Sequence, residues 1–246
     1  MIISHKHKFI FIKTRKTAGT SIEISLSRFC GKDDIITPII YQDELIREEM
    51  GLYPQNYGKS VKWTEYSIRD WKNLIRRGKK PKPQKATYYH HITAEKIRTL
   101  IGEDIWNSYF KFCFVRNPWD RAVSRYYWNI EKTKQVNTMD ESLQNSDPNA
   151  NFPIYTIDGK VAVDFVGRFE NLKQDFSDIC DRLHIPFDGW LPKTKAKSRK
   201  DKRHYTEVLT PEQVEYIRQK CAAEIELFGY TFEQPIFNQF GSSGRH

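Results

Sequence analysis

The chain has 246 residues, of which 40 are lysine or arginine and 31 are aspartate or glutamate, so its formal net charge is +9. This length suits one domain with a sizeable core. The excess of basic residues favours polyanionic partners such as nucleic acid, acidic glycan, a membrane surface or a multiply charged cofactor. The alternative is a basic protein surface without such a partner. The sequence contains no run of about 18 apolar residues, so it predicts no membrane-spanning helix, and its scattered cysteines without a Cys-x-x-Cys pair predict free thiols.

The first motif is a polar loop between an apolar strand and an amphipathic helix. Residues 9–12 predict a buried strand, residues 13–21 read Lys-Thr-Arg-Lys-Thr-Ala-Gly-Thr-Ser, and a helical pattern starts near residue 22. Such a loop is typical of a phosphate cradle, because backbone N–H groups and the positive end of the helix dipole meet there, and Lys16 adds a full charge. A nucleotide-kinase loop places its lysine after the glycines. Here the lysine comes first, which favours a different phosphate-bearing donor.

Two stretches between the predicted elements show no regular pattern. The first, residues 37–84, ends in a basic, proline-broken run and is expected to be an inserted loop, either a solvated linker or a source of acceptor contacts. The second, residues 132–158, is polar and rich in Asn and Asp, and we expect a loop or lid. Between these insertions, Tyr-Tyr-His-His at residues 88–91 precedes a helix that begins near Thr93.

A second strand followed by a helix carries further phosphate-binding side chains. Residues 111–115 predict a buried strand, and Asn117 and Pro118 are typical of a helix N-cap and of the first helical position. We therefore expect Arg116 at the end of the strand and Ser124 on the helix. A guanidinium fork and a hydroxyl in that arrangement can bind one phosphate group.

The rest of the chain continues to alternate strands and helices. Residues 161–166 predict a strand, and the spacing of apolar residues after Asn171 predicts a helix that packs on the core. The last helix is expected to begin at a capping-box pattern at Thr210 and to end at Gly229. The alternation predicts an α/β fold with a P-loop-like central parallel sheet, flanked by helices on both faces and interrupted by loop insertions.

The two motifs together resemble the nucleotide-binding elements of sulfotransferases that use PAPS (3′-phosphoadenosine 5′-phosphosulfate). Residues 16–21 look like the loop that binds the 5′-phosphosulfate, and residues 116–124 look like the element that binds the 3′-phosphate. The resemblance continues through residues 166–172 to about residue 230 and is closest to the carbohydrate branch that includes heparan sulfate 2-O-sulfotransferases. It implies transfer of a sulfuryl group from PAPS to an acceptor hydroxyl, with release of PAP and without a metal ion.

The resemblance also implies roles for individual residues. Lys16 would neutralise the departing 5′-phosphate in an in-line displacement, as cationic groups do in phosphoryl transfer. Arg116 and Ser124 would clamp the 3′-phosphate and so distinguish PAPS from ATP, whereas an Arg116 paired with an acid is the structural alternative. The cofactor-binding residues implied are Arg15, Lys16, Thr17, Ala18, Gly19, Thr20, Ser21, Arg116, Ser124, Ser198 and Arg199.

The acceptor hydroxyl also needs a base. A histidine titrates near neutral pH and suits this role. His91 lies just before a helix, where related glycan sulfotransferases place a catalytic histidine, and His90 is the second candidate. A packing role for one of the two histidines, or a carboxylate such as Glu65 or Asp70 as the base, stays open.

Other basic residues have simpler interpretations. Lys13 and Arg15 are weaker phosphate ligands, since each also fits a solvated position in the loop. Arg121 and Arg125 suit a phosphate site or a solvated helix surface equally well. Arg168 is expected to stabilise the fold by pairing with an acid.

Two other classes of function compete with the sulfotransferase interpretation. A kinase would share the fold and the loop, but it would need Mg²⁺ and an aspartate at a strand end, and only Asp164 comes near to that position. A nucleic-acid-binding module would bind with a steep salt dependence, yet it would leave both phosphate motifs unexplained. We therefore expect a hydroxyl-bearing acceptor, with an anionic glycan favoured by the basic loops, and no nucleic acid, metal or membrane span.

The ends of the chain give weaker indications. The start lacks the apolar core of a signal peptide, so the chain as given is expected to be cytoplasmic unless a native anchor precedes it. Residues 5–7, which read His-Lys-His, are expected to lie at a flexible end. We expect a single domain over residues 1–240, and residues 241–246 resemble an added tail without function.

Overall fold

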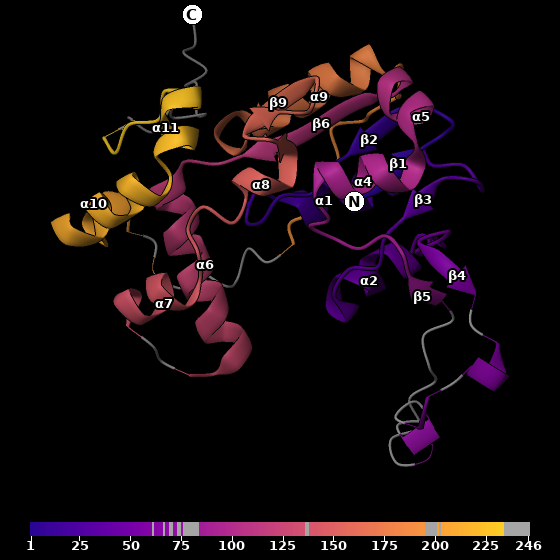
Figure 1. The fold of residues 1–246 in the computed structure, drawn as a ribbon, viewed down its shortest axis with the longest axis horizontal. Coiled ribbons are helices and arrows are strands. Elements are labelled where there is room, and N and C mark those ends of the chain that lie inside the picture. Colours follow the sequence, from indigo (N-terminus) through magenta and orange to yellow (C-terminus); the bar gives the residue numbers. More distant parts are fainter. Residues whose placement is uncertain are drawn as a thin grey trace, which may run out of the picture.

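A five-stranded sheet of order β3-β1-β2-β6-β9 forms the centre of the fold (Figure 1). The structure, a computed structural model, describes residues 1–60, 62–65, 67–68, 71–72, 75, 84–135, 138–194, 201 and 203–233. The strands of the sheet are β1 (Ile2–Ser4), β2 (Phe9–Phe11), β3 (Ile35–Ile36), β6 (Phe110–Val115) and β9 (Phe165–Arg168). Strands β2, β6 and β9 are parallel, which confirms the predicted α/β class with parallel strands.

The sheet also contains antiparallel pairs at one edge, which the sequence did not predict. Strand β1 runs antiparallel to both β2 and β3. Only residues 5–8 connect β1 to β2, and a connection this short can join only antiparallel strands. The expectation of a flexible end at residues 5–7 is therefore wrong as well: they form the turn of this hairpin, and the His5 ring nitrogen lies 2.8 Å from the Tyr109 hydroxyl.

Alternate side chains of the strands enter two separate cores, one on each face of the sheet. Ile10 and Cys113 belong to the core that α4, α6 and α10 cover, whereas Phe11 and Phe112 belong to the core that α1 and α9 cover. These helices are α1 (Gly19–Ser27), α4 (Ala94–Ile101), α6 (Pro118–Thr133), α9 (Leu172–Arg182) and α10 (Pro211–Lys220). Helices therefore flank both faces, as predicted.

The ends of the helices follow the sequence signals. The Asn117 side chain accepts hydrogen bonds from two main-chain N–H groups in the first turn of α6, and Pro118 is the first helical residue. Thr93 caps α4, and Thr210 forms the predicted capping box at the start of α10. Gly229 ends α11 (Ala222–Phe228) with a left-handed φ of 61°. These local rules, applied to single residues, locate the starts of α4, α6 and α10 and the end of α11 correctly.

Two predicted elements are divided in the structure. The strand predicted at 161–166 is split, because the Asp164 carboxylate accepts the main-chain N–H of Lys111 and interrupts the ladder. Its first part is β8 (Lys160–Val161), which pairs with β7 (Thr156–Ile157), and its last part belongs to β9. The single last helix is likewise two helices, α10 and α11, because Cys221 between them leaves the helical conformation.

Both predicted insertions contain regular structure, so the expectation of loops there is wrong for the described residues. Residues 132–158 include the end of α6, helix α7 (Met139–Asn145) and helix α8 (Phe152–Tyr155), and the side chains of Met139, Leu143 and Tyr155 are buried in the core. A few apolar residues in a polar stretch were enough to fix these short helices. Residues 37–84 include helix α2 (Tyr41–Glu48) and strand β4 (Gly58–Ser60), which pairs with β5 (Gln84–Ala86).

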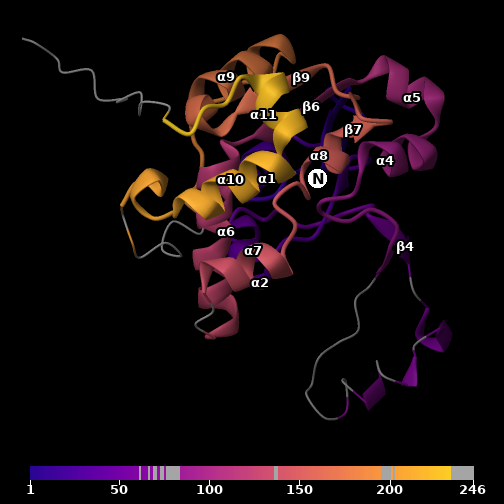
Figure 2. The ribbon, with the colours of Figure 1, turned by 60° about the vertical axis from the view of Figure 1, so that its left-hand side comes forward.

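The remaining elements complete the layers around the sheet. Helix α6 leads away from the end of β6 and carries α7 and α10 beside it (Figure 1). Figure 2 shows β4 on the opposite side of the molecule from α10 and α11. Among the described residues, the other short helical segments are α5 (Glu103–Ser108) and the 3₁₀ turns Trp63–Glu65, Phe169–Asn171 and Tyr205–Glu207.

Candidate active site

The loop between β2 and α1 forms a tight turn that leads into an uncapped helix start. Lys16 and Ala18 have left-handed φ values of 63° and 59°, which are rare for residues with a side chain. Ala18 is the N-cap of α1, and its side chain makes no capping hydrogen bond. The first main-chain N–H groups of a helix have no intrahelical acceptor, so a turn of this kind is suited to an anion. The predicted phosphate cradle thus has the expected backbone form.

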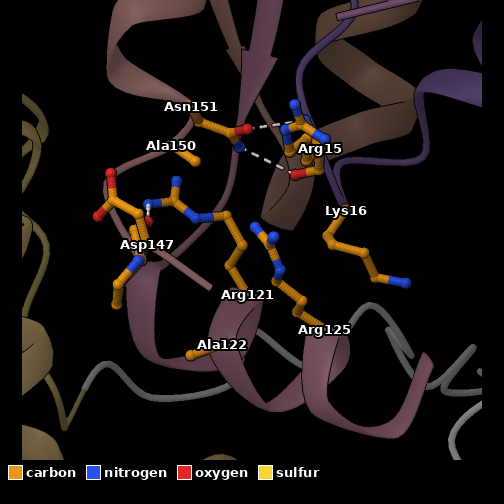
Figure 3. A pocket seen from close by; sticks show the side chains of 9 residues that line it. Arg15, Lys16, Arg121, Ala122, Arg125, Asp147, Ala150 and Asn151 are labelled. Atoms are coloured by element: carbon orange, nitrogen blue, oxygen red, sulfur yellow. Dashed lines mark hydrogen bonds between the residues drawn. The ribbon is translucent and has the colours of Figure 1, made fainter. Parts of the chain in front are cut away.

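Two neighbouring segments hold this loop in place. The Thr14 hydroxyl donates to the carbonyl of Phe114 in β6. The Asn151 amide pairs with the main chain of Arg15: its oxygen accepts the Arg15 N–H at 2.9 Å and its nitrogen donates to the Arg15 carbonyl at 2.9 Å (Figure 3). Asn151 was missed by the sequence analysis, because it is one of several asparagines in a stretch expected to be a loop.

Lys13 is a structural residue, which corrects the expectation of a solvated side chain. It is 5 % exposed and forms a buried ion pair with Glu23 of α1, whose carboxylate also contacts the amino group of Met1. Burial raises the pKa of Glu23, but the positive charges of Lys13 and the amino terminus outweigh it and lower the pKa well below its usual value. The ion pair ties the start of the loop to the helix behind it.

Gly19 is needed because the Lys13 side chain crosses directly over it. A Cβ atom at residue 19 would lie 2.7 Å from Lys13 Cγ. We expect Gly19→Ala to displace Lys13 and to lower the free energy of unfolding by about 1–3 kcal/mol, as overpacking of a core does. Urea denaturation measures this change. Gly31→Ala is the matched control, because its Cβ would meet Lys6 at an ordinary 3.7 Å; equal stabilities of the two variants would contradict the prediction.

Arg116 joins the second motif to the first. Its guanidinium donates to Asp120 Oδ2 at 2.8 and 2.7 Å and to the Lys16 carbonyl at 3.0 Å. It also stacks on the Phe169 ring, 4.0 Å from the ring centroid. Arg116 therefore forms the acid pair that the sequence allowed as an alternative, and at the same time it lies against the predicted phosphate loop.

One side of helix α6 faces the loop. Residues four apart on a helix lie on the same side, so Asp120, Ser124 and Trp128 form one row. Asp120, at one end of the row, forms an ion pair with Arg116. Trp128 is at the other end, and the Lys16 Nζ lies 5.5 Å from the centroid of its ring. Ser124 is half-buried between them. This row brings Arg116, Ser124 and Lys16, predicted from separate parts of the sequence, to a single site.

Four other residues were predicted to bind the cofactor, and the structure describes two of them, Thr20 and Ser21. The Ser21 hydroxyl lies 2.9 Å from the Thr194 hydroxyl, which precedes the basic segment expected to fold over the nucleotide. Ser198 and Arg199, the candidates in that segment, lie outside the described residues. The Thr20 side chain is buried at the start of α1.

Arg121 is not solvated, since it forms a buried ion pair. Its guanidinium donates to both carboxylate oxygens of Glu224 in α11 and to the Pro148 carbonyl. The Tyr155 hydroxyl donates to the same carboxylate at 3.1 Å. Arg121 thus joins α6 to α11 and to the segment before α8. Arg168 also stabilises the fold: its guanidinium donates to the Phe228 carbonyl at 2.7 Å, and its main-chain N–H donates to the Asp175 carboxylate at 2.6 Å.

Of the two histidines, His91 lies against the loop. Its Nδ1 is 2.8 Å from the Lys13 carbonyl, and because a carbonyl can only accept, Nδ1 carries the proton and Nε2 keeps its lone pair. Burial, followed by the charges of Lys13 and Arg15, lowers the pKa of His91 to about 3. The ring is therefore neutral at physiological pH but is a weaker base than the histidine titrating near neutral pH that the sequence suggested. His90 is exposed, with Nδ1 3.1 Å from the Pro38 carbonyl.

The alternative candidates for the base, a metal site and a membrane span can each be compared with the structure. Glu65 is exposed and accepts the Lys62 N–H, while Asp70 lies outside the described residues. In the part of the chain that the structure describes, no group of three or more His, Cys, Asp or Glu residues could hold a metal ion. Over the same ranges, none of the helices is both long and apolar enough to cross a bilayer.

Comparison with known proteins identifies the family. A solved structure of a sulfotransferase from Alicyclobacillus acidocaldarius is 18 % identical, covers 91 % of this chain and 96 % of its own, and superposes with a TM-score of 0.44. An uncharacterized protein of Archaeoglobus fulgidus is 35 % identical over 101 residues, which are 39 % of this chain and 84 % of that protein. Residues 1–156 match the family described as "Sulfotransferase family". Because that match covers more than half of the chain and includes both phosphate motifs, the protein belongs to the sulfotransferases, a family of PAPS-dependent transferases.

Proposed function

We propose that this protein transfers the sulfuryl group of PAPS to a hydroxyl of a carbohydrate acceptor and belongs to the carbohydrate branch of its family. The observation that carries the assignment of the PAPS site is the hydrogen bond from Arg116 to the Lys16 carbonyl at 3.0 Å, because it joins the two motifs. The carbohydrate acceptor rests on the resemblance of the motifs to the carbohydrate branch of the family.

The backbone of the loop would bind the 5′ end of the cofactor. The N–H groups of residues 17–21 stand at the start of α1, where the helix dipole favours an anion. Arg116 would bind the 3′-phosphate with Ser124, and Asp120 holds its guanidinium in position for a forked contact. We also assign Ser198 and Arg199 of the basic segment to this site, on the resemblance to the family alone.

We assign the two catalytic roles in this reaction to Lys16 and His91. The acceptor oxygen attacks sulfur as the bond from sulfur to the bridging phosphate oxygen breaks, and the negative charge that develops on this oxygen is neutralised by Lys16. The proton of the acceptor hydroxyl passes to Nε2 of His91, whose Nδ1 is held by the Lys13 carbonyl. PAP leaves, and the acceptor carries the sulfate ester.

Transfer of labelled sulfate tests this function. The protein is incubated with PAPS labelled in the sulfuryl group and with a panel of oligosaccharides, a tyrosine-containing peptide and simple phenols, in the presence of EDTA. We expect label on an oligosaccharide without a divalent cation. Label on the peptide or a phenol alone would contradict the carbohydrate assignment, and phosphate transfer from ATP that requires Mg²⁺ would favour a kinase.

The Lys16 side chain is expected to act on the reaction more than on folding. Removing one group that stabilises a developing oxyanion typically costs a factor of about 10²–10³ in kcat, so we expect a loss of this size for Lys16→Ala. Lys132→Ala is the matched control, because its ammonium contacts the same Trp128 ring, at 4.8 Å from the centroid. Equal rates for the two variants would show that Lys16 has no special role.

A further inference from the structure

Beside Lys16 there is a hollow whose walls are rich in arginine. Its lining includes Arg15, Lys16, Arg121, Arg125, Asp147 and Asn151, which Figure 3 shows converging from the phosphate loop, helix α6 and the segment before α8. The hollow encloses about 280 Å³, part of it open to solvent. Because part of this volume is open to solvent, the hollow has room for a single charged group rather than for a whole small ligand.

The positive charge of this hollow is not balanced. Arg121 is neutralised by Glu224, whereas Asp147 is the one acid beside Arg15 and Arg125 among the described residues that line the hollow. The Arg15 Nε–H is buried and has no hydrogen-bond partner. Burial and the nearby charge of Arg15 lower the pKa of Arg125. Within the described ranges of the chain, no side-chain hydrogen bond or ion pair satisfies either guanidinium, so two like charges share a half-buried space that an anion would stabilise.

The position of the hollow separates it from the proposed cofactor site. Arg121 and Arg125 are four residues apart and form a row of their own on α6. This row is offset by one residue from the row that contains Ser124. Both phosphates of PAPS already have partners in the proposed site, at the loop backbone and at Arg116. Lys16 belongs to both places, since it lines the hollow and marks where the sulfuryl group would sit. A group bound in the hollow would therefore lie beside the reacting end of the cofactor.

We propose that Arg15 and Arg125 form a subsite for a carboxylate or sulfate group of the acceptor, close to the hydroxyl that receives the new sulfate. This inference rests on the proposed function. It assigns Arg15 to acceptor binding instead of cofactor binding. The Asn151 clamp on the Arg15 main chain gives the subsite a fixed geometry relative to Lys16. Asp147 limits the net charge, so that one anionic group rather than two is the matching ligand.

Binding of an anionic glycan to the protein saturated with PAP tests the subsite. The probe is a heparin tetrasaccharide, with its desulfated, carboxyl-reduced form as the uncharged control, and calorimetry gives both dissociation constants. Because bound PAP already occupies the phosphate sites, the probe reports only what lies beyond them. We expect Arg125→Ala and Arg15→Ala to weaken probe binding at least tenfold, the size expected for a lost hydrogen-bonded charge, and to change PAP binding less than twofold.

Lys173→Ala, on the exposed part of α9, is the control for net charge and should change neither constant. Probe binding that is equal in wild type and Arg125→Ala would overturn the subsite and leave the cofactor site untouched. Displacement of the probe by PAP, or a loss of PAP affinity in Arg125→Ala, would assign the hollow to the cofactor and also overturn the proposal. A wild-type protein that does not bind PAP at all would instead overturn the proposed function and, with it, the acceptor assignment. The unchanged PAP affinity also shows that the variants are folded.

Discussion

Replacing His91 with asparagine is expected to lower kcat by a factor of about 10²–10⁴, the usual contribution of a general base. Asparagine keeps a nitrogen near the position of Nδ1 and can still donate to the Lys13 carbonyl, but it has no basic nitrogen to accept the acceptor proton. PAP binding should therefore stay within about twofold of wild type. Turnover with labelled PAPS and calorimetry with PAP separate the two effects.

The pH dependence provides an independent check on His91. Because its pKa is lowered to about 3, the ring stays neutral at a lower pH than an ordinary histidine, whose pKa is about 6.5. We expect kcat/KM, which reports the free enzyme, to show no acid limb from His91 between pH 5 and 8. His90→Asn is the matched control and should leave the rate unchanged. Full activity of His91→Asn, or loss only in His90→Asn, would exclude His91 as the base.

Replacing Glu224 with alanine is expected to lower the free energy of unfolding by about 3–5 kcal/mol. The substitution leaves the Arg121 guanidinium buried without its counter-charge and removes the acceptor of the Tyr155 hydroxyl. The double variant Arg121→Met, Glu224→Leu removes both charges and should recover most of the lost free energy of unfolding. An apolar pair of similar volume is often as stable as a buried ion pair. Urea denaturation measures each variant.

Glu215→Ala is the control for this prediction. Glu215 pairs with Arg218 on the exposed side of α10, where both side chains are more than half exposed, and such pairs contribute at most about 1 kcal/mol. If Glu224→Ala were no more destabilising than Glu215→Ala, the Arg121 pair would not be the structural link between α6 and α11 that its burial indicates.

The sequence predicted those parts of the site that depend on local rules. The order of strand, loop and helix around Lys16, the N-cap at Asn117 and the position of Arg116 at the end of β6 are confirmed, because each is set by residues close to it in the chain. The parallel pairing of β2 with β6 then brings the two motifs together, since parallel strands end at the same edge of a sheet.

The parts that the sequence could not predict depend on contacts between distant residues. Nothing near Lys13 or Arg121 indicates that each is paired with a buried glutamate, because Glu23 and Glu224 are indistinguishable from surface residues until their helices are placed. Asn151 holds the phosphate loop from 136 residues away. The same reason explains the wrong prediction of a loop at residues 132–158, whose few apolar side chains matter only once they meet the core.

Calorimetric titration with PAP, ADP and ATP tests most directly whether the two motifs form one PAPS site. Without Mg²⁺, we expect PAP to bind at least tenfold more tightly than ADP, because only PAP carries the 3′-phosphate that Arg116 and Ser124 would contact. Arg116→Ala and Ser124→Ala should reduce that preference while ADP binding changes little. Equal affinity for PAP and ADP in the wild type, or binding of ATP with Mg²⁺ while PAP is ignored, would contradict the account.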